Sequence, residues 1–265
     1  GRLNDMTRTR RATVAMLLVG LAIFSSLYST QAILPTLVDN MGLSSTKAAM
    51  TVSAATGALA LCVVPASILS ERFGRGRILL ISAVSATSVG LIVPLAAEGW
   101  HLILLRGLQG ALLSGAPATA MAWLSEELDD KALPRAMGLY IAGTSVGGLT
   151  GRLIPTGLVE ISTWRWALFG SALVSLAFAI TSWLLLPAQR NFRPKSIHLT
   201  SESRALFGHW ANRDLALLFL TAFLSMGTFV SMYNFLTFRL IDDFGLAPSL
   251  AGLAFLFYLS GTWSS

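Results

Sequence analysis

Uninterrupted apolar stretches of about 20 residues recur along this chain and restrict how it can fold. A stretch of this length crosses a hydrocarbon core roughly 30 Å thick if it is helical. Because lipid offers no hydrogen-bond partners to the backbone, each crossing stretch must be a helix. The apolar residues do not alternate with polar ones, as the strands of a membrane barrel require. The sequence therefore predicts an all-α polytopic membrane protein with eight spans, at about 12–37, 46–69, 77–97, 101–124, 136–158, 165–187, 214–238 and 248–265.

The charges set the expected orientation of these spans. Only 12% of the residues are charged, against about 25% in soluble proteins. Fourteen of the 19 Lys and Arg residues precede the first span or fall in the second, fourth and sixth loops, and three fall in the other loops. Lys and Arg collect in cytoplasmic loops. We therefore expect a multi-pass protein of the bacterial inner membrane with a cytoplasmic N-terminus, and the net charge of +6 indicates a lipid bilayer rather than nucleic acid as its partner.

A polar, basic stretch divides the chain. We expect a six-helix bundle at 1–187, a cytoplasmic linker at 188–213 and the start of a second bundle at 214–265. The segment from Leu37 to Ser44 recurs from Leu240 to Ala247, and at the same offset Gln31 corresponds to Asn234. Parallel repeats of this kind occur in transporters, although two similar span boundaries could also arise by chance. With only two spans after the linker, we expect a fragment that lacks about four spans.

The loop after the second span carries a compact group of charges. Gly74 predicts a tight turn that brings an acid and several guanidinium groups to one membrane face, where they can form bidentate pairs. We expect Arg75 to pair with Glu126 or Glu127 at the end of the fourth span. Solvated charges of an ordinary cytoplasmic loop are the alternative. The candidate residues of this latch are Glu71, Arg72, Gly74, Arg75, Arg77 and Glu126.

Two arginines lie inside predicted spans. An arginine at the centre of a span costs at least about 2.5–3.5 kcal/mol, so it usually faces a polar cavity or a partner. Arg106, in the fourth span, is expected to face a cavity, and snorkelling of its side chain to the outer surface is the competing explanation. For Arg152, near the outer end of the fifth span, both explanations stay open.

The fifth span also carries a glycine-rich face. Gly143, Gly147 and Gly151 recur at every fourth position and so lie on one side of a helix, with Gly148 beside them. Such a face allows two helix backbones to approach closely. We therefore predict tight helix packing there.

Polar and aromatic side chains within the spans are the candidates for contact with a solute. Tyr28 and Gln31 lie three residues apart and share a helix face. Tyrosines also anchor spans at the interface, and amides also bond one helix to another, so these alternatives stay open. A cavity of amides and phenols favours a neutral or weakly polar solute. The candidates are Tyr28, Gln31, Arg106, Gln109, Tyr140, Tyr233 and Asn234.

The acidic residues leave the energy source open. None of the 13 Asp and Glu residues falls in the middle of a span, whereas a proton-coupled carrier commonly uses a buried carboxylate. Asp39, at the outer end of the first span, is the candidate for proton coupling together with Arg106. The three histidines lack metal-ligand spacing, and no phosphate-binding loop is present. We predict no metal, no cofactor and no enzymatic activity, with a proton gradient as the energy source.

Together these motifs resemble those of the major facilitator superfamily. Residues 67–77 resemble its signature loop, Gly-x-Leu-a-Asp-Arg-x-Gly-Arg-Arg/Lys, with Ser67, Glu71 and Gly76 as departures. Residues 106–110 resemble its Arg-x-x-Gln-Gly motif. Residues 143–152 resemble its antiporter motif, Gly-x-x-x-Gly-Pro-x-x-Gly-Gly, with Gly148 in place of the proline. The runs 124–127 and 147–152 resemble those of arabinose-efflux-permease-like exporters.

The resemblance implies a fold and a function. The fold is a complete N-terminal six-helix bundle with the first two helices of a second bundle, and the first, fourth and seventh spans line a central cavity. The charged loop latches the outward-facing state, and Arg106 takes part in proton transfer. The function is proton-coupled export of a drug, sugar or metabolite by alternating access, as a monomer. An importer or facilitator of the same fold, and a membrane receptor or scaffold that does not transport, are the alternatives.

Overall fold

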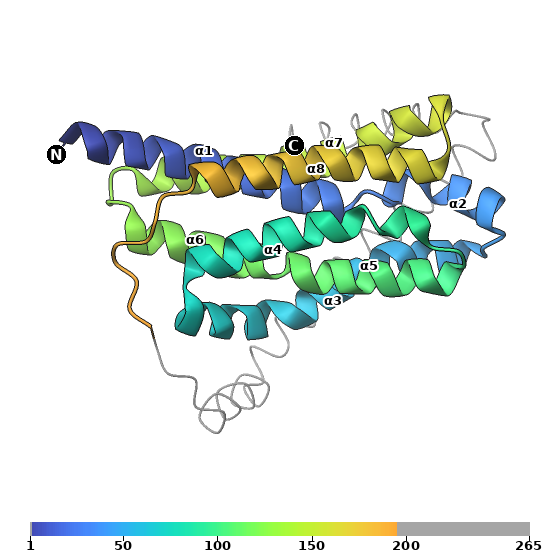
Figure 1. Ribbon diagram of the computed structural model, residues 1–265, viewed down its shortest axis with the longest axis horizontal. Helices are drawn as coiled ribbons and strands as arrows, with labels where there is room; N and C mark the ends of the chain where they lie inside the picture. Colours follow the sequence, from blue (N-terminus) through green and yellow to red (C-terminus); the bar gives the residue numbers. More distant parts are fainter. Residues whose placement is uncertain (1, 195–265) are drawn as a thin grey trace, which may run out of the picture.

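The computed structural model describes residues 2–194, which form helices joined by short turns and contain no β-strand in that range (Figure 1). The all-α prediction is confirmed for these residues. The predicted seventh and eighth spans, most of the linker, Tyr233 and Asn234 lie outside the described residues. The elements are α1 (Arg2–Leu27), η1 (Gln31–Ile33), α2 (Leu34–Met41), α3 (Ser45–Phe73), α4 (Arg75–Gly90), η2 (Val93–Leu95), α5 (Gly99–Leu113), α6 (Gly115–Glu127), α7 (Leu133–Ile161) and α8 (Trp164–Leu185).

Four helical segments among the described residues are long and apolar enough to cross a membrane: Leu3–Met41, Ser45–Phe73, Arg75–Leu95 and Trp164–Leu185. They correspond to the first, second, third and sixth predicted spans. The predicted fourth span is divided between α5 and α6. The predicted fifth span is α7, whose glycine, serine and threonine residues lower its hydropathy.

The first predicted span is a discontinuous helix. The α-helix of α1 stops at Leu27, a turn follows at 28–30, and the chain continues through η1 into α2. Pro35 lies in the first turn of α2, where its missing N–H costs no helical hydrogen bond, so it suits the start of a new helix after the break. A continuous helix over 12–37 was the expectation from hydropathy, which does not register a local loss of helical hydrogen bonds.

A second break divides the fourth predicted span at Ser114. Pro117, in the first turn of α6, has no N–H to bond the carbonyl of Leu113, which favours a break at this point. Ser82 of α4 donates its hydroxyl to the carbonyl of Leu112 at 2.5 Å, which satisfies one acceptor beside the break. The serine therefore bonds the carbonyl next to the one that Pro117 leaves without a donor.

The helices pack in neighbouring pairs that define the bundle. α1 packs on α7 and α8, α3 packs on α5, and α4 packs on α6 and α8. In Figure 1, α1 and α8 run side by side above α4 and α6. The start of α1, the α3–α4 and α6–α7 turns and the end of α8 share one end of the bundle, which we call the N-terminal end.

Candidate functional site

Arg106 of α5 is fully buried, and its guanidinium group is bonded to three helices. Its Nε donates to the carbonyl of Thr51 in α3 at 3.0 Å, and its Nη1 donates to the carbonyl of Ser26 at 2.8 Å. Its Nη2 donates to the carbonyl of Leu27. The same Nη1 lies 2.6 Å from Oε1 of Gln109, one helical turn away, and 3.3 Å from the hydroxyl of Ser29.

These contacts explain how a charged side chain is accommodated inside the bundle. The last carbonyl groups of a helix have no intrahelical donors and carry partial negative charge. Arg106 supplies N–H groups to the carbonyls of Ser26 and Leu27, where α1 stops. The side chain therefore does not snorkel to the outer surface. It caps the interrupted first span.

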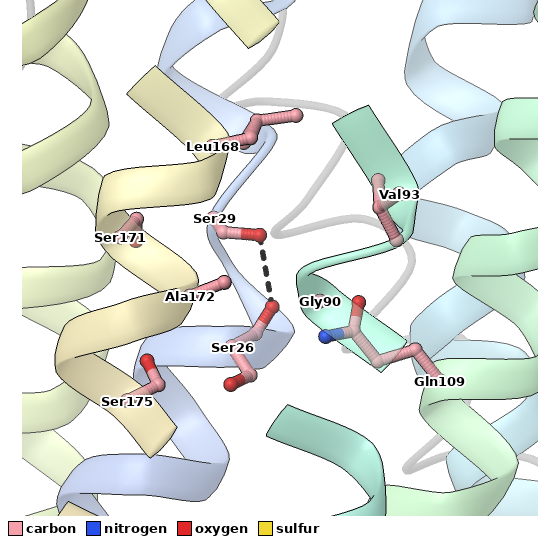
Figure 2. A pocket seen from close by; sticks show the side chains of 9 residues that line it. All are labelled: Ser26, Ser29, Gly90, Val93, Gln109, Leu168, Ser171, Ala172 and Ser175. Atoms are coloured by element: carbon pink, nitrogen blue, oxygen red, sulfur yellow. Dashed lines mark hydrogen bonds between the residues drawn. The ribbon is translucent and has the colours of Figure 1, made fainter. Parts of the chain in front are cut away.

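A small polar cavity lies beside this cap (Figure 2). It has room for about one water molecule. Figure 2 shows Gln109 reaching from α5 towards Ser26 of α1, with Ser171 and Ser175 on the neighbouring α8. The lining residues are Ser26, Ser29, Gly90, Val93, Gln109, Leu168, Ser171, Ala172 and Ser175. Hydroxyl and amide groups from three helices thus meet next to the Arg106 guanidinium.

Arg152 of α7 lies on the other side of the same break in the first span. Its side chain is buried, its Nε donates to Oε1 of Gln31 at 3.0 Å, and its Nη1 donates to the carbonyl of Gly148 at 3.1 Å. The guanidinium carbon is 4.3 Å from the centroid of the Tyr28 ring, a distance typical of a cation–π contact. Arg152, Gln31 and Tyr28 therefore form one cluster, and Arg152 is turned inwards rather than towards the surface.

The glycine-rich face of α7 lies against α1. A Cβ atom added to Gly143 would be 2.5 Å from the carbonyl oxygen of Leu17, and one added to Gly151 would be 2.4 Å from that of Ser25. At Gly147 the nearest α1 backbone atoms would be 2.9 Å away. Any side chain at these positions would separate the two helices, so the glycines set the distance between α1 and α7.

Gly148 departs from the expected proline at a position that contacts the cluster. A Cβ atom added there would be 3.3 Å from Nη1 of Arg152 and 3.8 Å from the Tyr28 ring. Its carbonyl accepts a hydrogen bond from Arg152. The bare backbone at 148 thus leaves room for the guanidinium.

At the N-terminal end of the bundle, Arg75 bonds the residues around the α3–α4 turn to α6. Its Nε is 3.3 Å from Oε1 of Glu126, and its Nη1 donates to the hydroxyl of Ser70 at 2.7 Å. Gly74 forms the turn itself with a φ of +108°, a conformation that side chains rarely adopt. Of the two expected partners, Glu126 is the one that Arg75 contacts. The remaining latch candidates lie around the same turn, with Glu71 half-buried and Arg72 and Arg77 exposed.

Glu127 contacts a different set of groups. Its side chain is fully buried and accepts hydrogen bonds from Arg8 at 2.7 Å and from the backbone N–H groups of Arg190 and Asn191 at 3.0 and 2.9 Å. Burial by itself raises the pKa of this carboxyl, but the two backbone donors and the bond and charge of Arg8 outweigh it and lower the pKa. The lowered value keeps Glu127 ionised, beyond the end of the predicted fourth span.

The other candidate residues are more widely spread. Tyr140 is buried in α7 within the apolar cluster that includes Val19 and Ala136. Asp39 is exposed near the end of α2, away from the buried arginines. The structure therefore brings Tyr28, Gln31 and Arg152 together, and Arg106 together with Gln109, but it places Tyr140 and Asp39 elsewhere.

Several residues of these clusters were not singled out from the sequence. The serines of the small cavity come from α1, the turn that follows it, and α8. Arg8, Gln189 and Asn191 come from the two ends of the described chain. A signal for the serines was present, because five of the six residues from Ser25 to Thr30 carry hydroxyl groups within an apolar span. Nothing in the sequence pairs Arg8 with a residue 119 positions away.

Comparison with known proteins identifies the relatives of the chain. The family model described as Major Facilitator Superfamily matches residues 16–264. The inner membrane transport protein YnfM of Escherichia coli (strain K12) is 37% identical over 96% of this chain, and the multidrug resistance protein MdtG of Proteus mirabilis (strain HI4320) is 30% identical over 71% of it. The chain spans 61% of the length of YnfM, and its match covers 46% of MdtG.

A solved structure shares the fold. It is the crystal structure of a bacterial homolog to the human lysosomal transporter Spinster, in an inward-facing and unoccupied conformation. The TM-score is 0.68 over 94% of this chain and 58% of that chain, and 16% of the residues are identical. At this identity the likeness establishes the fold alone.

Proposed function

The chain belongs to the major facilitator superfamily, and we propose that it works within a secondary active transporter that exports a small molecule by proton-coupled alternating access. The observation that carries the proposal is the interruption of the first span at residues 28–30, with a buried arginine on either side. Irregular backbone at membrane depth is tolerated where it is enclosed by protein or lines a cavity, and transporters place substrate sites at such breaks.

The contacts at the N-terminal end of the bundle support alternating access. Arg75 connects the α3–α4 turn to Glu126 of α6 through an ion pair whose side chains are 14% and 34% exposed. A pair that is accessible to water is worth about 0–1 kcal/mol, which is weak enough to break and form during a transport cycle. We infer that this pair latches one conformational state, as the signature loop of the family implies.

Two features support export and an inner-membrane location. The glycine face of α7 resembles the antiporter motif, and MdtG carries the name of a multidrug resistance protein. YnfM is named as an inner membrane protein, and the distribution of Lys and Arg favours a cytoplasmic N-terminus. We propose that the transporter is a monomer and that it uses the proton gradient without a cofactor.

A facilitator is the second candidate. The buried charges described within the spans are Arg106 and Arg152, whereas the proposed proton carrier Asp39 is exposed. A carrier that works without a proton would need no buried carboxylate.

Transport measurements with the natural full-length protein in proteoliposomes separate these functions. Under an imposed pH gradient, we expect a solute to move against its own gradient and opposite to the protons, and an ionophore that dissipates the pH gradient should abolish this movement. Flux that only follows the solute gradient and ignores pH would establish a facilitator. Absence of flux across a broad panel of drugs, sugars and organic acids would contradict transport and favour a receptor or scaffold.

A further inference from the structure

Gln31 has a buried hydrogen-bond donor without an acceptor among the residues that the structure describes. The residue is 0% exposed, and its Nε2 makes no hydrogen bond to any group within residues 2–194. Leaving a buried polar group unpaired costs about 1–3 kcal/mol. Such a group in a native structure therefore calls for a partner that is absent from it.

The contact with Arg152 determines which way the amide faces. Arginine has only donors, so the group that meets its Nε at 3.0 Å must be the amide oxygen of Gln31. An alternative assignment with the nitrogen facing Arg152 would place two donors against each other. The Nε2 group is therefore the part of the amide that is left to bind an acceptor.

The surroundings of this donor select the chemistry of the acceptor. The guanidinium of Arg152 is permanently charged and bonded directly to the same amide, so the electrostatic potential at Nε2 favours a negative group. The Tyr28 ring, at 4.3 Å from the guanidinium carbon, covers the charge with an aromatic face and is only partly buried. Tyr28 is thus the member of the cluster that reaches the accessible surface.

The two buried arginines are suited to different tasks. The guanidinium of Arg106 is held by backbone carbonyls of α1 and α3, and turning it towards a solute would uncap α1. The Arg152–Gln31 contact is instead made by two side chains, which can rotate without breaking a helix. Recognition of a charged group is therefore more readily achieved at Arg152.

We propose that Arg152, Gln31 and Tyr28 bind a carboxylate group of the transported solute, with Nε2 of Gln31 and the Arg152 guanidinium as its partners and Tyr28 at the entrance. This inference rests on the proposed transport function. It replaces the expectation of a neutral solute, which was based on the amide and phenol groups of the spans considered without Arg152. In the conformation described the donor is enclosed, so binding requires the break at 28–30 to open.

Equilibrium binding to the natural full-length protein in detergent, without any gradient, tests the site. The probes are three carboxylates and the amides of the same skeletons: benzoate with benzamide, succinate with succinamide, and shikimate with shikimamide. We expect at least one carboxylate to bind, and its amide to bind at least about tenfold more weakly, the size of one lost charged hydrogen bond. Absence of binding by all three carboxylates, or equal binding of acid and amide, would overturn the proposal.

Three variants link the result to the cluster. Gln31→Glu preserves the oxygen that meets Arg152 but replaces the Nε2 donor with a negative charge, so it should fold and lose carboxylate binding. Arg152→Gln should also lose the preference for acid over amide. Arg165→Gln is the matched control, because Arg165 also donates to backbone carbonyls and lies 4.3 Å from an aromatic ring, that of Trp164, but outside the cluster. Carboxylate binding that persists in Gln31→Glu would refute the site even if Arg152→Gln does not fold.

The two proposals can fail separately. Carboxylate binding that depends on Gln31 and Arg152, in a protein that shows no flux in proteoliposomes, would support the site and contradict transport. Gradient-driven flux of a neutral solute that is unchanged in Gln31→Glu would support transport and refute the site.

Discussion

Arg8 and Glu127 form an ion pair of 2.7 Å that joins the first helix to the end of α6. The Glu127 side chain is fully buried, and the carboxylate also accepts the backbone N–H groups of Arg190 and Asn191. Replacement by glutamine removes the charge while retaining the shape. We expect Glu127→Gln to destabilise the protein by about 1–3 kcal/mol, because three donors lose a charged acceptor. The thermal unfolding midpoint in detergent measures the effect.

Glu126 provides the control for this prediction. Its side chain is 34% exposed and pairs with Arg75 at 3.3 Å, so Glu126→Gln should cost less than about 1 kcal/mol. Equal destabilisation by the two substitutions would show that burial of Glu127 does not matter to its contribution.

The lowered pKa of Glu127 predicts a loss of stability in acid. Since hydrogen bonds from Arg190, Asn191 and Arg8 hold the folded pKa below the ordinary value of 4.5, the ionised carboxylate stabilises the fold above that pH. The contribution should decline as the pH falls from 4.5 through the folded pKa. The measurement compares the thermal unfolding midpoints of the unsubstituted protein and of Glu127→Gln, from pH 7 down to the lowest pH at which the protein stays folded. The difference between the two proteins should shrink in acid, and a constant difference would contradict the assignment.

The contact between α7 and α1 predicts opposite effects at two glycines of the same helix. In Gly151→Ala, the new methyl group would lie 2.4 Å from the carbonyl oxygen of Ser25, so the helices must separate, at a cost of about 1–3 kcal/mol. At exposed Gly138 a methyl group would meet no atom of the described part of the chain within 4 Å, and alanine is the better helix former by about 1 kcal/mol. We expect Gly138→Ala to raise the unfolding midpoint and Gly151→Ala to lower it. A rise in both would mean that the helices are not in close contact at Gly151.

Because Arg106 caps α1 with several N–H groups, we expect the stability of the protein to depend on both its charge and the number of its donors. In Arg106→Gln, the buried carbonyls of Ser26 and Leu27 lose their charged donors, and we expect a loss of about 1–3 kcal/mol for each carbonyl left without a donor. Arg106→Lys retains the charge but cannot reach Thr51 and both carbonyls of α1 at once. Its stability should therefore lie between that of the unsubstituted protein and that of Arg106→Gln. The folded fraction after extraction, measured by size-exclusion chromatography, reports both variants. Lysine that performs as well as arginine would indicate that charge alone stabilises the break.

Sequence patterns predicted the helical spans because two physical requirements dictate them. A span must be long enough to cross the hydrocarbon core, and its backbone groups must find their hydrogen-bond partners within the helix. They also predicted close packing at Gly143, Gly147 and Gly151, which the structure places against α1. The break at 28–30 was not predicted, although Pro35 and the hydroxyl-rich run before it are compatible with one. Arg106, 79 residues away from Leu27, supplies hydrogen-bond donors to the end of the interrupted helix. Contacts at such separations are set by tertiary packing and leave no local periodicity.

The anchored residues after α8 have a mechanical consequence. Gln189 accepts the backbone N–H of Gly76 at the start of α4, Asn191 donates to the carbonyl of Glu126 in α6, and Arg8 of α1 donates to the carbonyl of Ala188. Tension applied to the chain beyond residue 194 would therefore be shared among the ends of α1, α4 and α6 instead of peeling away α8 alone.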